Sequence, residues 1–217
     1  MNDDCRKLKD HIGFVKVKIQ QFRKISCCID YTHFYDGSNQ EIKTLKYKHM
    51  KKVIVFLEKM VEDSEFQYPY LRLKEEGFDV VSVAPEKKVY QGKGGQSFMP
   101  DKSFAEVKNE VFDAVIIPGG YAPDMWRRDE GIVNFVKKHD DAGKLIASIC
   151  HGPWLMISAG IVKGRNVTGF MAIKDDLLNA GAIYEGKDWV EDGNLLTSTN
   201  PKTMLPMMKR LVERLKE

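Results

Sequence analysis

One cysteine stands where a thiol could act as a nucleophile. Cys150 lies in the string AlaSerIleCysHisGlyPro, residues 147–153, directly after the apolar run 144–149. A buried strand followed at once by a helix forms a sharp elbow, which projects the side chain at the turn from the sheet. The N-terminus of the following helix has a positive dipole and unpaired amides, and both favour a thiolate. We therefore predict that Cys150 is a reactive thiol with a lowered pKa, against the alternative of an inert buried cysteine.

Two glycines mark a second strand end. The string IleIleProGlyGlyTyrAlaPro, residues 116–123, overlaps the end of another apolar run. Glycine lets backbone amides approach a substrate closely. The amides of Gly119 and Gly120, together with that of His151, are therefore candidates for an oxyanion hole. A plain Gly-Gly turn would have the same sequence, so this string is weak evidence by itself.

Acidic residues mark a third strand end. The string ValGluAspSerGluPheGlnTyrProTyr, residues 61–70, places Glu62 and Glu65 shortly after the apolar run 51–57. A buried carboxyl group in contact with a thiol would tend to be protonated and to donate a hydrogen bond to the thiolate. A solvated acidic loop is the competing interpretation of the same residues.

The elements that position these strings alternate between strands and helices. Apolar runs predict strands at 51–57, 79–84, 113–118, 144–149 and 194–199, and helices are expected at 64–76, 129–139, 151–159, 172–180 and 202–216. Strands that are apolar at nearly every position are buried on both faces, which favours a parallel sheet in a doubly wound α/β fold. Functional groups in such folds gather at the carboxyl ends of the strands, so the three strings should meet.

The first 49 residues depart from this pattern. Residues 29–35 and 41–47 flank AspGlySerAsn and predict a β-hairpin, and residues 14–19 are a candidate for another strand. The segment 1–49 has ten Lys and Arg against six Asp and Glu, whereas residues 50–217 have 24 against 25. We interpret 1–49 either as a small N-terminal β extension or as a non-native start before Met50, and 50–217 as the main domain.

Composition and motif spacing exclude several functions. No apolar run is long enough to span a bilayer and the N-terminus is too polar for a signal peptide, so we expect a cytoplasmic protein that binds no membrane. The nearly neutral main domain argues against nucleic acid as a partner. The four cysteines form no CxxC pair and the five histidines form no spaced ligand set, so we expect no metal. The string GlnGlyLysGlyGlyGlnSer, 91–97, lacks phosphate-loop spacing and is interpreted as a flexible β-turn, and we expect no cofactor.

Taken together, the strings resemble the PfpI family within the class I glutamine amidotransferase-like superfamily. The resemblance rests on SerIleCysHisGlyPro, ProGlyGlyTyrAlaPro and IleLysAspAspLeuLeuAsnAlaGly (173–181), and it covers residues 53 to about 215. It implies a flavodoxin-like three-layer sandwich with a mostly parallel sheet. It also implies that Cys150 is the nucleophile, His151 its neighbour and Glu65 the carboxyl partner of the thiol, with Glu62 as a second acidic residue near the pocket.

The resemblance further implies a homo-oligomer with a shared active site. Asp124 maps to a carboxylate that can reach the histidine of an adjoining subunit, although a longer Glu is familiar there. Phe170 and Met171 stand where a Tyr is often found. Because adjacent residues on a tight turn point apart, we expect the His151 imidazole to face away from the thiol, where Asp124 of a neighbour would orient it.

The resemblance and the three strings favour a cofactor-independent cysteine enzyme that acts on small reactive aldehydes. Cys150 would add to methylglyoxal, and a proton shift followed by hydrolysis would give lactate, with His151 and Glu65 as candidate proton shuttles. The same chemistry would remove early glycation adducts, which is a deglycase activity. The alternatives are an intracellular cysteine peptidase and a redox- or stress-sensing thiol protein. A small pocket would favour the aldehyde, and a wide interfacial cleft would favour a peptide.

Overall fold

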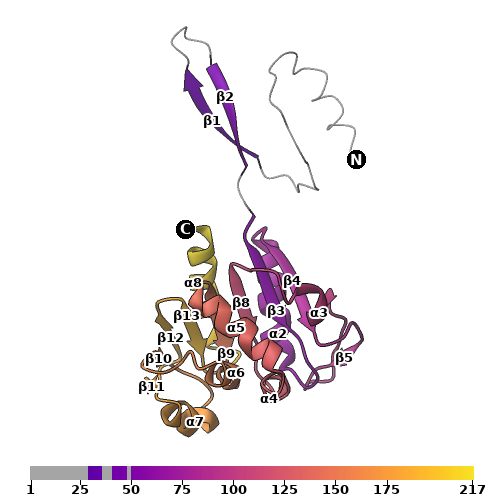
Figure 1. Cartoon of the computed structure of the whole chain (residues 1–217), viewed down its shortest axis with the longest axis vertical. Helices are drawn as coiled ribbons and strands as arrows, with labels where there is room; N and C mark the ends of the chain where they lie inside the picture. Colours follow the sequence, from indigo (N-terminus) through magenta and orange to yellow (C-terminus); the bar gives the residue numbers. More distant parts are fainter. Residues whose placement is uncertain (1–28, 36–40, 48–49) are drawn as a thin grey trace. The chain divides into compact units, whose positions relative to one another are not determined.

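The computed structural model describes residues 29–35, 41–47 and 50–217 (Figure 1). The chain divides into two units, Met1–His49 and Met50–Glu217. In the first unit, β1 (Ile29–Tyr35) and β2 (Glu41–Tyr47) are antiparallel, with Ile29 opposite Tyr47. These are the two strands of the predicted hairpin. The candidate strand at 14–19 lies outside the described residues.

A seven-stranded sheet forms the centre of the second unit, in the order β12-β13-β9-β8-β3-β4-β7. Its strands are β3 (Lys52–Phe56), β4 (Asp79–Ala84), β7 (Lys102–Ser103), β8 (Ala114–Ile117), β9 (Leu145–Ile149), β12 (Trp189–Asp192) and β13 (Leu195–Ser198). Every pairing is parallel except that of β12 with β13. The five predicted strands are all present. The edge strands β7 and β12 escaped prediction because they are short and mostly half-exposed, without a continuous apolar run.

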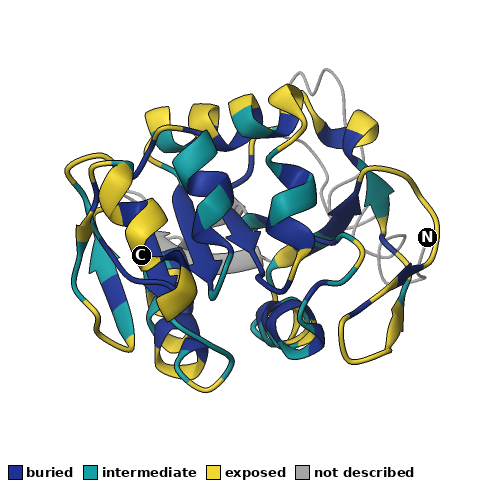
Figure 2. Ribbon diagram, turned by 90° about the horizontal axis from the view of Figure 1, so that it is seen from below, coloured by how far each residue is buried: buried dark blue, intermediate teal, exposed yellow. Residues whose placement is uncertain are grey.

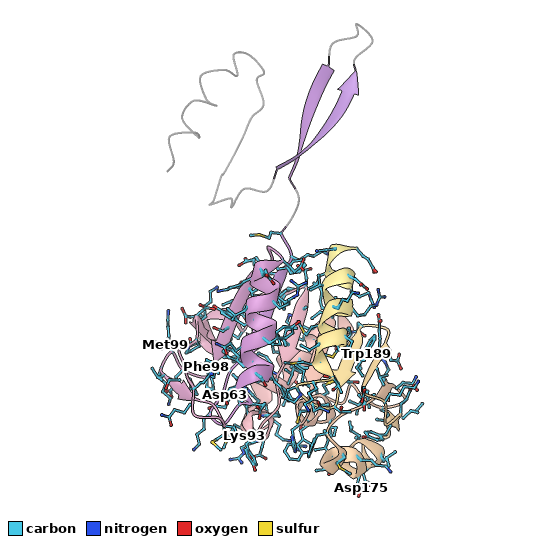
Figure 3. All side chains as sticks on the ribbon, turned by 180° about the vertical axis from the view of Figure 1, so that it is seen from behind. Asp63, Lys93, Phe98, Met99, Asp175 and Trp189 are labelled. Carbon is cyan, nitrogen blue, oxygen red and sulfur yellow. The ribbon has the colours of Figure 1, made fainter. Side chains whose placement is uncertain are left out.

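Helices cover both faces of this sheet. The helices α2 (Asp63–Glu75) and α8 (Met204–Lys216) lie on one face, and α5 (Glu130–Asp141) lies on the other with α4 (Ala122–Trp126) and α6 (Pro153–Ser158) (Figures 1 and 3). Buried strands lie between helices whose outer surfaces are exposed (Figure 2). The fold is thus the predicted flavodoxin-like three-layer sandwich.

Shorter elements fill the edges of the sheet. They are β5 (Tyr90–Gln91), β6 (Ser97–Phe98), α3 (Phe104–Val107), β10 (Asn166–Val167), η1 (Met171–Ile173), α7 (Lys174–Asn179) and β11 (Ile183–Tyr184). The strands β5 and β6 form a small antiparallel hairpin, and β10 pairs with β11 in parallel. In the described ranges, no helix combines the length and the apolar character needed to cross a bilayer.

The central strands explain why the sheet is stable and where its ends point. The strands β8 and β9 are buried at every position because helices cover both faces, which is the usual condition for a parallel sheet. Since β3, β8 and β9 are neighbours and run in the same direction, their carboxyl ends lie side by side. The loops that follow these three strands contain the three strings singled out from the sequence.

Candidate active site

The chain turns sharply at Cys150, directly after β9. Cys150 has φ 59°, a left-handed conformation that is uncommon for a residue with a side chain. Its amide donates to the Ser198 carbonyl at 2.8 Å, and its carbonyl accepts from the Phe170 amide at 2.8 Å. A Cβ at Gly152 would collide with the Ile117 carbonyl oxygen, so the turn also requires glycine two residues later. The predicted strand-to-helix elbow is therefore present.

A pocket of about 350 Å³ opens beside this elbow. Its lining residues are Glu62, Glu65, Lys93, Gly120, Tyr121, Cys150, His151, Phe170, Asn200 and Pro201. The pocket thus brings together most of the site residues that the sequence suggested, from the loops after β3, β8 and β9. Asp124 and Gly119 are not part of the lining.

Glu65 supplies a buried carboxyl group beside the thiol. Its side chain has no exposed surface, and Oε2 accepts a hydrogen bond of 2.8 Å from the Gly119 amide. Its other oxygen, Oε1, is buried without a hydrogen-bond partner. Burial raises the pKa of Glu65 to about 7, while the Gly119 amide acts in the opposite direction. The carboxyl is therefore poised to hold a proton near neutral pH, as expected from the sequence.

The thiol itself does not follow the prediction of a lowered pKa. Burial, together with the adjacent Glu65 carboxylate, raises the pKa of Cys150 to about 12, and the amides of His151 and Gly120 only partly offset this. The helix that was expected to lower the pKa begins only at Pro153 and has six residues. Because the charge of the Glu65 carboxylate is one cause of the raised pKa of Cys150, a thiolate forms more readily while Glu65 is protonated.

The imidazole of His151 lies against the thiol, which corrects the expectation that it faces away. Its Nδ1 is 3.2 Å from Sγ of Cys150. The left-handed backbone at Cys150 turns both side chains toward the same pocket, so the rule for adjacent residues on a tight turn does not apply here. Burial lowers the pKa of His151, and the positive charge of Lys93 acts in the same direction. The imidazole is therefore held in its neutral form.

Two of the three expected oxyanion-hole amides face the sulfur. The amides of Gly120 and His151 both point toward Sγ of Cys150 and favour its negative charge. The Gly119 amide instead donates to Glu65, so the expectation that it binds an oxyanion is wrong. The Gly-Gly string serves two purposes: the first amide holds the carboxyl group, and the second faces the reacting centre.

Asp124 lies outside the pocket of its own chain. It is on α4 and forms an ion pair with Arg128, one turn further along the chain. Its side chain is partly exposed, with 43% of its surface accessible. Within one chain, therefore, Asp124 makes no contact that would orient His151.

Lys93 is a pocket residue that the sequence did not single out. It lies on the loop between β5 and β6, near Asp63 at the start of α2 (Figure 3). Asp63 accepts hydrogen bonds from the amides of Gly94 and Gln96, and the Lys93 amide donates to the Val61 carbonyl at 2.8 Å. The predicted flexible turn is thus a tethered hairpin, and Lys93 Nζ lies 3.3 Å from a carboxylate oxygen of Glu62.

The glycines around Lys93 were the missed signal. A Cβ at Gly92 would lie 2.5 Å from an Asp63 carboxylate oxygen, and one at Gly94 would lie 2.9 Å from the other. The loop can approach α2 only because both residues lack a side chain. The two glycines on either side of Lys93 thus indicate a loop that packs closely on Asp63 and is fixed rather than flexible.

Asn200 and Pro201 complete the pocket from the carboxyl end of β13. The Asn200 side chain accepts from the Lys202 amide at 2.9 Å and so fixes the turn that leads into α8. The sequence predicted a strand at 194–199, but neither Asn200 nor Pro201 was among the predicted site residues. In the described part of the chain, no group of three His, Cys, Asp or Glu side chains is arranged to hold a metal ion.

A mostly parallel α/β sandwich with a cysteine on the elbow after a central strand, and a buried carboxyl group beside it, defines the class of this protein. The model of the DJ-1/PfpI family matches residues 51–214, and the chain belongs to that family. It is 42% identical to Deglycase PfpI of Pyrococcus furiosus over 165 residues, which are 76% of this chain and 99% of that protein.

Two further relatives illustrate the range of the family. The chain is 37% identical over 152 residues to YraA of Bacillus subtilis, whose name describes it provisionally as a cysteine protease; the match covers 70% of this chain and 90% of that one. A crystal structure from Anabaena variabilis, of a two-domain protein with DJ-1/ThiJ/PfpI-like and ferritin-like domains, superimposes with a TM-score of 0.73 at 42% identity. That match covers 76% of this chain and 48% of the two-domain protein.

Proposed function

We propose that this protein is a cysteine enzyme that needs no cofactor and acts on small reactive aldehydes. In this proposal it converts methylglyoxal to lactate and removes early aldehyde adducts from amines and thiols. The names of relatives such as Deglycase PfpI support the second activity. The observation that carries the proposal is the pocket, because its size and its polar groups suit a small carbonyl compound.

The pocket volume of about 350 Å³ lies near the lower end of the range for small-molecule sites, which is roughly 300–1,000 Å³. Such a space accommodates a three-carbon aldehyde with water, or the end of a modified side chain. A peptide lying across the site would need an extended groove on both sides of the thiol. The size of the pocket therefore favours the aldehyde over peptide hydrolysis.

The chemistry proceeds without an external oxidant. The Cys150 thiolate adds to the aldehyde carbon of methylglyoxal, and the oxygen of that carbonyl takes a proton, which gives a hemithioacetal. The C–H proton of this carbon then moves to the neighbouring ketone carbon, and the hydroxyl proton passes to the ketone oxygen, so that the first carbon becomes a thioester and the second an alcohol. Water cleaves the thioester, which releases lactate and a proton and restores the thiol. One carbon is oxidised while its neighbour is reduced.

The groups around the thiol have the reach and the protonation that these steps need. Glu65 holds a proton next to the sulfur near neutral pH, so it can stabilise the thiolate and then protonate the oxygen. Neutral His151 is a base within 3.2 Å of the sulfur and can carry the migrating proton. The amides of Gly120 and His151 can stabilise negative charge on the substrate oxygen.

We also propose that the protein assembles as a homo-oligomer in which Asp124 approaches the site of a neighbouring chain. Asp124 is partly exposed on α4, and Tyr121, which directly precedes α4, is both a pocket residue and more than half exposed. A segment that lies both in the pocket wall and on the surface is suited to an interface. Dilution to the monomer should then lower specific activity, and unchanged activity on dilution would contradict a shared site.

The decisive experiment compares wild type with Cys150→Ala on methylglyoxal and on a fluorogenic peptide. We expect lactate from the wild type, none above background from Cys150→Ala, and little peptide cleavage by either. Peptide cleavage that depends on Cys150, without lactate formation, would establish the peptidase instead. A thiol that oxidises readily without turnover of either compound would establish the sensor protein.

A further inference from the structure

The His151 imidazole packs against two aromatic rings. The centroid of its ring lies 4.9 Å from that of Phe170, with 31° between the planes, and 5.1 Å from that of Trp154, with 58° between the planes. We propose that Phe170 and Trp154 are positioning residues that hold the His151 ring in the orientation in which Nδ1 faces the Cys150 sulfur. This rests on the proposed function, in which the imidazole carries a proton during turnover.

A main-chain hydrogen bond fixes the Phe170 backbone relative to the elbow. The Phe170 amide donates to the Cys150 carbonyl at 2.8 Å. Phe170, which packs on His151, is therefore hydrogen-bonded to Cys150, the residue directly before His151. Gly169 eases this approach, because a Cβ there would make a tight contact of 3.2 Å with that same carbonyl oxygen. The Phe170 backbone therefore cannot shift along the elbow without loss of a main-chain hydrogen bond, and this limits where its ring can lie.

A separate set of contacts fixes the Trp154 ring. Its Nε1 donates to the Asp176 carboxylate on α7 at 2.8 Å. The guanidinium carbon of Arg127 lies 5.9 Å from the centroid of the Trp154 ring, and Arg127 is itself held by the Ser158 hydroxyl at 2.9 Å. Trp154 and Phe170 thus depend on different segments of the chain and meet at His151.

Two aromatic rings packed against the imidazole restrict its rotation. An imidazole attached to a turn would otherwise choose among several orientations, in only some of which Nδ1 reaches the sulfur. Orientation of a catalytic group is worth a large rate factor, since a displacement of about 1 Å can cost roughly 100-fold. The aromatic contacts provide this restriction within one chain, whereas an orienting carboxylate from Asp124 would require a neighbour.

The same contacts determine how the imidazole responds to pH. Charged or titratable groups that share its pocket are Cys150 on the elbow, Lys93 on the β5–β6 loop, Tyr121 just before α4, and Glu62 and Glu65 on or just before α2. Asp176 contacts the outer edge of Trp154 rather than the imidazole. Exclusion of water is the larger cause of the lowered pKa of His151, and Lys93 the smaller one. Loss of an aromatic neighbour should let water in and raise the pKa, while Lys93 stays.

The experiment is a titration of the His151 ring by NMR in the full chain, alongside the pH profile of kcat/KM for methylglyoxal. The variants are Phe170→Ala, Phe170→Tyr and Trp154→Leu. Met171→Ala is the control, since Met171 adjoins Phe170, is 77% exposed and is not among the residues that line the pocket. Phe170→Leu is a second variant at the same position that retains apolar bulk without an aromatic face.

We expect Phe170→Ala and Trp154→Leu to raise the titration midpoint of His151 and to move the acid limb of the activity profile upward by the same amount. We also expect kcat/KM to fall by roughly 10- to 100-fold. Phe170→Tyr should restore both quantities, and Met171→Ala should match wild type. An unchanged His151 titration in folded Phe170→Ala and Phe170→Leu would overturn the proposal.

The two proposals fail in different ways. Wild-type protein that makes no lactate would refute the proposed function, while the NMR midpoints would still show whether the two rings hold the imidazole. A shift of the His151 midpoint in Asp124→Ala, with none in the Phe170 and Trp154 variants, would assign the orientation to a neighbouring chain and overturn the proposal made here.

Discussion

The main-chain amide of Gly119 is bonded to the Glu65 carboxyl group at 2.8 Å. This hydrogen bond joins the loop after β8 to the first turn of α2, directly beside the elbow that carries Cys150. It leaves the other carboxyl oxygen of Glu65 buried without a hydrogen-bond partner, in a side chain that interacts with the thiol. The position of the proton in the site therefore depends on a backbone group that no substitution of side chains can alter directly.

Gly119→Ala should lower activity far more than the addition of one methyl group suggests. The added Cβ would lie 2.7 Å from Oε2 of Glu65 and 2.8 Å from Cβ of Cys150, so the carboxyl group and the thiol would have to separate. We expect a loss of roughly 100-fold in kcat/KM, with the fold retained. Activity with methylglyoxal and circular dichroism measure the two quantities. Activity near that of wild type would show that the loop has room to shift.

Glu65→Gln should impair activity much more than Glu62→Gln, and it should change the pH dependence of stability. The pKa of Glu65 is raised to about 7, so the folded state favours the protonated carboxyl, which is fully retained only below the unfolded pKa of 4.5. As pH rises through 7, wild type should lose about 3 kcal/mol that the amide variant keeps. Urea unfolding from pH 4.5 to 8.5 measures this difference. Parallel curves for wild type and Glu65→Gln would contradict the raised pKa.

Asp63→Ala should release the β5–β6 loop. Asp63 accepts hydrogen bonds from the amides of Gly94 and Gln96, and its removal would leave both without that partner. We expect a loss of roughly 1–3 kcal/mol in the free energy of unfolding and faster hydrogen exchange at those two amides. Asp63→Asn, which keeps one acceptor, is the matched variant and should lie between. Unchanged exchange in Asp63→Ala would show that other contacts hold the loop.

His139 should make the protein less stable below pH 6.5. It is buried on α5, its Nε2 accepts from the Phe112 amide at 3.0 Å, and its Nδ1 lies 2.8 Å from the Phe135 carbonyl. Burial lowers the pKa of His139, so the unfolded chain gains a proton first as pH falls, and stability is lost below the unfolded pKa of 6.5.

The matching variant is His139→Leu, which removes the titratable group. Near pH 8 it should be less stable than wild type by roughly 1–3 kcal/mol, because the Phe112 amide loses its acceptor. The gap between the two proteins should narrow on acidification from pH 6.5. Thermal unfolding across this range tests the effect, and a gap that widens toward low pH would refute it.

Deletion of residues 1–49 should leave a folded and active protein. The family match begins at residue 51, and the second unit begins at Met50, just before β3. We expect the shortened chain to keep its thermal midpoint within a few degrees and its kcat/KM within about twofold. An insoluble or inactive product would show that the first unit contributes to the stability of the second.

The sequence predicted the fold well because continuous apolar runs leave little choice. A run such as residues 144–149 needs cover on both faces, and a parallel sheet between two layers of helices supplies it. The edge strand β12 escaped notice because it is only partly buried and lacks such a run. Short pieces such as β7 and α3 depend on contacts with distant segments, which local pattern cannot reveal.

The sequence predicted which residues form the site more successfully than it predicted how they are oriented. Cys150, His151 and Glu65 do share one pocket, since each follows a strand of the same sheet edge. The orientation of His151 was wrong because the left-handed backbone of Cys150 cannot be inferred from a Cys-His pair. Lys93 was missed because its loop reaches the pocket through contacts with Asp63, thirty residues away in the sequence.

The left-handed backbone of Cys150 has a consequence for how the chain tolerates replacement of its thiol. At φ 59° a glycine fits without strain, whereas a residue with a Cβ costs free energy there. Cys150→Gly should therefore unfold at a higher temperature than Cys150→Ala, even though glycine usually weakens a fold. At residue 150 the backbone conformation favours glycine, whereas the proposed chemistry requires cysteine. A lineage released from the need for a thiol would find glycine at residue 150 to be a stabilising change.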